Sequence, residues 1–120
     1  LLSYGTILGN VIKASEYLDK ERSISCHVEN IHTLNPLDNK IKDLLKDFKI
    51  VITIEEHSIV GGLGTIISEL ITENNFSIKH KKIALPKKFL KSGTYDQLLK
   101  RYLLSEEEIY QRILDEQLSI

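Results

Sequence analysis

The stretch Ile50-Val51-Ile52-Thr53-Ile54, followed by Glu55-Glu56-His57-Ser58, decides the fold. Every residue from 50 to 54 is β-branched, which favours a strand over a helix. Both alternating faces of this stretch are largely apolar, so neither face suits contact with water. A strand of this kind is typical of the centre of a parallel sheet that helices cover on both sides.

On either side of this strand, the apolar residues follow a helical spacing. That spacing predicts a helix across 41–48, with Asp38 as its amino-terminal cap after a turn, and another helix across 63–71. Ser105 and Glu108 have the spacing of a capping box at the start of a further helix. The remaining elements are expected as a short strand within 1–8, a helix from about Asn10 to Lys20, a strand from Ser23 to Ile31, a strand from Phe76 to Leu85, a helix across 95–102 and a last helix from 105 towards 118.

Strands and helices therefore alternate along the chain, which indicates an α/β fold. We expect three layers, α/β/α, around a mainly parallel sheet of four strands in the order 2-1-3-4. The length of 120 residues fits a single domain over residues 1–120. The sequence has no methionine, and Leu1 opens directly on a strand-like run, so we expect a fragment of a longer protein.

The composition excludes several classes of protein. Sixteen Lys and Arg against seventeen Asp and Glu leave a formal net charge of -1, which argues against nucleic acid or a membrane surface as a partner. A single cysteine excludes a disulfide framework and a thiolate-rich zinc site. No apolar run is long enough to span a membrane, so we expect a cytoplasmic protein.

The most concentrated polar group is Glu55, Glu56 and His57, directly after the central strand. Ligands of open α/β sheets bind at the carboxyl ends of strands, where His32 is also expected. A carboxylate beside an imidazole can perform acid–base chemistry. Alternatively, the two carboxylates cap a loop and His57 forms a hydrogen bond with the backbone. Both interpretations remain open at this stage.

Gly61, Gly62 and Gly64 open the helix that follows. Glycines at a helix start let backbone amides approach a phosphate. Equally, small residues let the helix start press against the sheet or a partner. The pattern is neither a dinucleotide fingerprint, since Ile67 takes the third glycine position, nor a Walker A loop.

Two other clusters are weaker. The lysines between 79 and 91, with His80 among them, lack the interleaved aromatic residues of a nucleic-acid module and indicate a solvated face. Cys26, His27 and His32 match no standard metal spacing, so no metal site is expected.

Taken together, the ordered motifs resemble the C-terminal domain of the transketolase family. In that family a strand ends in Glu-Glu-(His/Asn), and a Gly-Gly-x-Gly turn starts the next helix. The matching segments are Ser3-Tyr4-Gly5-Thr6, Thr33 to Asp38, Val51 to Gly64, Phe89 to Gly93, Leu98-Leu99 and Leu104-Ser105. Asn35 departs from the pattern, because a lysine is common there.

The resemblance implies part of a thiamine-diphosphate enzyme that transfers two-carbon ketol units between sugar phosphates. It implies that thiamine diphosphate and magnesium belong to other domains of the parent enzyme, because the Gly-Asp-Gly signature is missing here. No catalytic or cofactor-binding residue is expected in this chain. The candidate strand-end or interface residues are His32, Glu55, Glu56, His57, Gly61, Gly62 and Gly64.

The implied partners are the remaining transketolase-like domains or a partner chain, with a homodimer of the full enzyme. The domain would then support assembly and border the active site. Alternatives are the C-terminal domain of a deoxyxylulose-phosphate synthase, a docking or dimerisation module of a 2-oxoacid dehydrogenase beta subunit, and a freestanding phosphate-binding module. The family also has a further antiparallel edge strand, so we expect the 23–31 strand to show an unpaired edge.

Overall fold

The computed structural model describes residues 1–34, 36–86 and 92–118, with no side-chain description for 117 and 118. Asn35, Lys87, Lys88, Phe89 and Lys91, which the sequence analysis singled out, lie outside the described residues. In chain order the elements are β1 (Leu2–Ser3), the 3-10 turn η1 (Gly5–Ile7), α1 (Leu8–Arg22), β2 (Glu29–Asn30), α2 (Asn39–Leu45), β3 (Ile50–Ser58), α3 (Leu63–Glu73), β4 (Lys79–Leu85), α4 (Tyr95–Arg101) and α5 (Glu106–Leu118).

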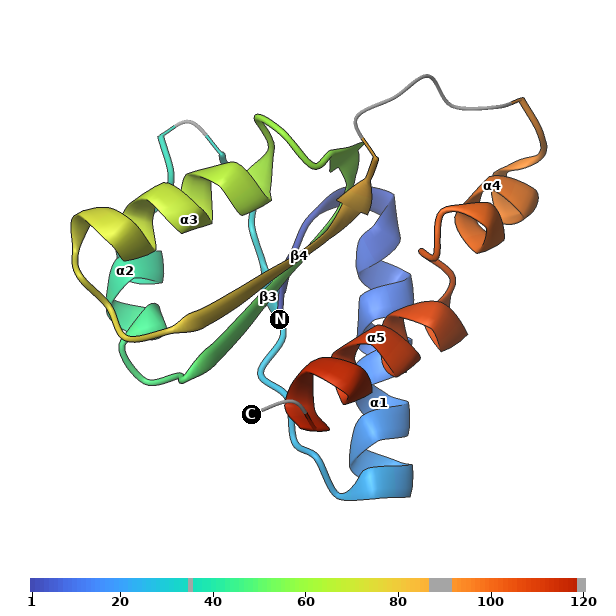
Figure 1. Ribbon diagram of the computed structural model, residues 1–120, viewed down its shortest axis with the longest axis horizontal. Coiled ribbons are helices and arrows are strands. Elements are labelled where there is room, and N and C mark those ends of the chain that lie inside the picture. Colours follow the sequence, from blue (N-terminus) through green and yellow to red (C-terminus); the bar gives the residue numbers. More distant parts are fainter. Residues whose placement is uncertain (35, 87–91, 119–120) are drawn as a thin grey trace.

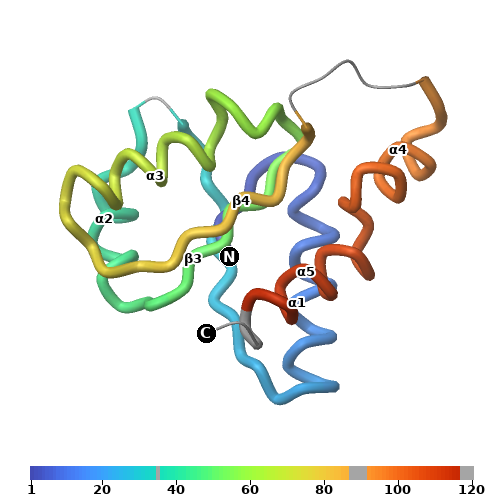
Figure 2. The backbone as a smooth tube through the Cα atoms, in the orientation of Figure 1, coloured from blue at the N-terminus to red at the C-terminus, as the bar shows by residue number. Residues whose placement is uncertain are grey.

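The four strands form one parallel sheet in the order β2-β1-β3-β4, which confirms the predicted fold (Figure 1). Helices α2 and α3 lie on one side of the sheet, and α1 and α5 lie on the other (Figures 1 and 2). Each side has its own buried apolar cluster, one around Leu63 and Ile67 and the other around Leu18 and Ile109. The central strand β3 supplies both clusters, because Val51 faces the first and Ile52 the second.

The predicted strand from Ser23 to Ile31 was wrong in length, since only Glu29–Asn30 is a strand. The assigned length follows the pairing with β1, in which Leu2 lies opposite Glu29 and Ser3 opposite Asn30, and the Leu1 amine still donates to the His27 carbonyl oxygen before them. Ile24, Cys26 and Val28 still pack against the core, as their alternation indicated. Among the described strands β2 pairs only with β1, so its outer edge is unpaired there, as expected.

The bounds of other elements differ from the predicted bounds by a few residues. The strand expected from Phe76 begins at Lys79, opposite Ile50, because β3 starts there and offers no earlier partner. Asp38 caps α2 as predicted, accepting the Lys40 N–H at 2.9 Å. The Ser105 hydroxyl accepts the Glu108 N–H at 3.4 Å, which is one half of the predicted capping box. A reciprocal capping box that the sequence analysis missed joins Thr94 and Gln97 at the start of α4.

Candidate functional site

The polar group after the central strand lies on a bulge in β3. Ile54 pairs with Ile83 and Ser58 with Leu85, so three residues of β3 stand opposite one residue of β4. A bulge of this kind breaks the simple alternation of a strand and re-aims its side chains. As a result, Glu55 is buried while Glu56 and His57 are exposed.

The Glu55 carboxylate closes the amino end of α3. Only 1% of the residue is exposed, and its two oxygens accept the N–H of Leu63 at 3.0 Å and of Gly64 at 2.7 Å. These amides belong to the first turn of α3, and amides of a first turn have no acceptor within the helix. A carboxylate there also meets the positive end of the helix dipole. Glu55 therefore takes the place that the phosphate interpretation would assign to a bound anion.

Tyr4 brings the first strand into the same network. Its hydroxyl donates to Glu55 Oε1 at 3.3 Å, and it follows β1 directly. Burial, together with the neighbouring Glu55 carboxylate, raises the pKa of Tyr4, so its phenol stays protonated as a donor. The buried carboxylate thus joins β1, β3 and α3 at the carboxyl edge of the sheet.

The glycines of the loop allow this close approach. A Cβ at Gly62 would overlap Glu55 Oε1 and lie 2.9 Å from His57 Nδ1. A Cβ at Gly64 would lie 2.8 Å from Lys82 Cγ and 3.1 Å from Thr53 Oγ1. Gly61 has a φ of +84°, which glycine adopts without strain. These contacts support the interpretation that small residues let the helix start press against the sheet.

His57 is held by the backbone, as one of the two sequence interpretations proposed. Its Nδ1 lies 2.9 Å from the Ser58 carbonyl oxygen and 3.9 Å from Glu55 Oε1, and half of its side chain is exposed. Glu56 accepts a hydrogen bond from the hydroxyl of Tyr95, the first residue of α4. Partial burial and this carboxylate raise the pKa of Tyr95 to about 12.

The structure does not bring all the candidate strand-end residues together. Glu55, His57, Gly62 and Gly64 lie together, whereas His32 is exposed in the segment after β2. In the described part of the chain, no hydrogen bond or ion pair joins His32 to the glutamates or to His57. His32 is therefore not in contact with Glu55 or His57, as an acid–base site built from these residues would require.

Sequence analysis missed the role of His80. On β4, its ring lies between the Thr53 hydroxyl at 3.1 Å and the Ser68 hydroxyl at 2.9 Å. Burial, with a smaller contribution from the Lys82 charge, lowers the pKa of His80 to about 4. The ring is therefore neutral and links β3, β4 and α3. The alternation of β4, which places His80 on the face opposite Lys79 and Lys81, was the signal that could have found it.

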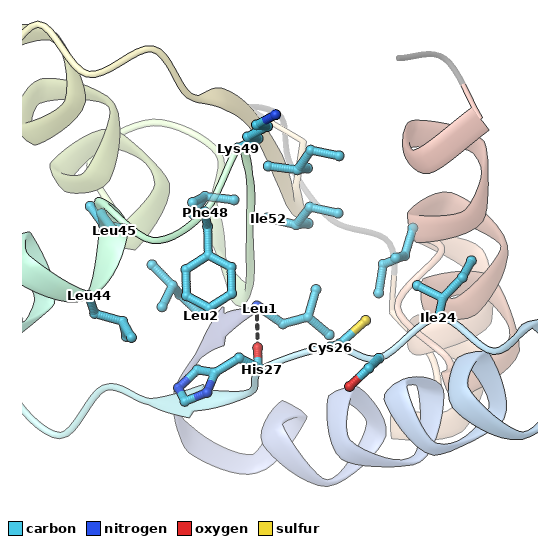
Figure 3. Close-up of a pocket in the computed structure, with 14 residues that line it drawn as sticks. Leu1, Leu2, Ile24, Cys26, His27, Leu44, Leu45, Phe48, Lys49 and Ile52 are labelled. Carbon is cyan, nitrogen blue, oxygen red and sulfur yellow. Dashed lines mark hydrogen bonds between the residues drawn. The ribbon is translucent and has the colours of Figure 1, made fainter.

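An apolar cavity of about 350 Å³ lies at the opposite, amino edge of the sheet (Figure 3). Leu2, Ile52 and Phe48 are among its walls, and the Leu1 amine donates to the His27 carbonyl oxygen at 2.7 Å inside it. Cys26 also lines the cavity, and burial raises the pKa of its thiol. No set of three or more His, Cys, Asp and Glu residues that could hold a metal ion occurs in residues 1–34, 36–86 and 92–118.

The fold and the site together make this chain an α/β domain with a parallel 2-1-3-4 sheet, whose bulged central strand ends on a carboxylate that caps the next helix, as the resemblance to the transketolase C-terminal domain implies. The chain belongs to this family: the family model described as "Transketolase, C-terminal domain" matches residues 1–109. The resemblance stated from the sequence motifs is thereby confirmed.

Relatives of this family are longer proteins. A protein of Methanocaldococcus jannaschii named as a transketolase C-terminal section is 38% identical over 97% of this chain and 36% of its own length. The 1-deoxy-D-xylulose-5-phosphate synthase of Blochmanniella pennsylvanica is 30% identical over 95% of this chain and 18% of its own length. The chain thus spans about a third or less of the length of these curated relatives.

A solved structure carries the same fold. The split-gene transketolase in an inactive beta4 tetramer superposes with a TM-score of 0.84 at 25% identity, covering 95% of this chain and 37% of that one. Across the described residues, no helix is long and apolar enough to cross a membrane.

Proposed function

We propose that this chain is the non-catalytic C-terminal part of a cytoplasmic, transketolase-like enzyme that transfers two-carbon ketol units between sugar phosphates. In this proposal the domain supports assembly and borders the active site, and the full enzyme is a homodimer. Thiamine diphosphate and magnesium are held by the remaining domains or by a partner chain. Family membership and the shorter span of this chain support the proposal.

The observation that carries it is the occupation of the α3 amino end by Glu55. In an α/β domain, the glycine-rich start of such a helix is the ordinary place for a diphosphate. Here a buried carboxylate of the protein itself accepts those amides, and its negative charge would repel a phosphate. This occupation of the α3 amino end supports the proposal that the cofactor's diphosphate is bound by another part of the enzyme.

The test is reconstitution with the cofactor-bearing section, identified by reading the coding sequence upstream of Leu1 for a Gly-Asp-Gly signature. Titration calorimetry should detect thiamine diphosphate binding by that section with magnesium, and none by the 120-residue chain alone. Ketol transfer should require both parts. Specific binding of thiamine diphosphate to the isolated chain would refute the proposal.

A second candidate is the C-terminal domain of a deoxyxylulose-phosphate synthase, which the 30% identity to such an enzyme favours. Product analysis of the reconstituted enzyme separates the two: formation of 1-deoxy-D-xylulose 5-phosphate supports the synthase, and a ketose phosphate extended by two carbons supports the transketolase. The docking-module alternative, a 2-oxoacid dehydrogenase beta subunit, predicts instead that the chain purifies with a dehydrogenase complex.

A further inference from the structure

We draw no further inference here: the strongest candidate, the apolar cavity at the amino edge of the sheet between Leu2, Phe48 and Ile52, carries nothing, because nothing in the described part of the structure shows what covers it.

Discussion

The Glu55 carboxylate occupies the space that any side chain at Gly62 would need. The two residues come from different elements, one from the bulge of β3 and the other from the residue before α3. Their contact lets a buried charge reach the free amides of a helix start, and it connects the folding of the sheet to the placement of that helix.

We expect Gly62→Ala to lower the free energy of unfolding by about 2–3 kcal/mol, because the added methyl group would displace Glu55. Urea denaturation followed by circular dichroism measures this change. Gly9→Ala is the matched control, since Gly9 lies in α1 with nothing within 4 Å of its Cβ position. It should be neutral or stabilising by up to about 1 kcal/mol. Equal stability of the Gly62→Ala variant and the wild type would refute the close contact.

Glu55→Ala should cost about 2–3 kcal/mol of unfolding free energy, because it leaves two buried amides of α3 without acceptors. Glu55→Gln keeps one acceptor oxygen and should cost less, about 1–2 kcal/mol. Chemical denaturation at neutral pH provides the comparison. Glu56→Gln at the neighbouring exposed position should change stability by no more than about 0.5 kcal/mol. Similar losses at both positions would contradict the capping role of Glu55.

Stability should fall as the pH drops from about 6.5 to about 4, because of His80. Its pKa is about 4 in the folded chain and near 6.5 when unfolded, so protons bind the unfolded state more readily in this window. The stabilisation is complete above pH 6.5 and is lost towards pH 4. After allowance for partial exposure of the ring, the expected loss is about 1–2 kcal/mol.

Urea titrations at several pH values test this dependence. His80→Gln should flatten the fall over the stated window, whereas His27→Ala, which alters an exposed ring, should leave it in place. A His80→Gln variant with the unchanged pH profile of the wild type would show that other groups cause the acid sensitivity.

Cys26 should react slowly with a thiol reagent such as dithionitrobenzoate at pH 7.5. Burial raises the pKa of its thiol, and the thiolate is the reactive form. Since it is the single cysteine of the chain, one reaction is observed, and unfolding in urea should speed it roughly tenfold or more. Equal rates in the folded and unfolded chain would show that the cavity wall at Cys26 is open to the reagent.

Much of the fold was predictable because its signals are local. The apolar β-branched run at 50–54 identified the central strand, and the helical spacing around it identified the helices that cover it. Strand length was harder to predict, because it depends on a neighbour. Residues 24–28 have the alternation of a strand, but the parallel pairing with β1 begins only at Glu29, opposite Leu2.

The site was predictable in its position and less so in its chemistry. Glu55, Glu56 and His57 follow the central strand as expected, yet alternation alone does not reveal that a bulge buries Glu55 and exposes the next two residues. The link between Glu56 and Tyr95 joins residues 39 positions apart, and the His80 bridge joins three elements. Contacts of this separation leave no periodic pattern in the sequence.

The amino-acid sequence by itself determined the order of elements, the parallel sheet and the family to which the domain belongs, since these follow from spacing and ordered motifs within the chain. The tertiary structure decided what the Glu-Glu-His and glycine segments do. Only the folded chain brings the Glu55 carboxylate onto the amides of α3 and turns His57 outward, because a buried charge is placed by the partners that surround it.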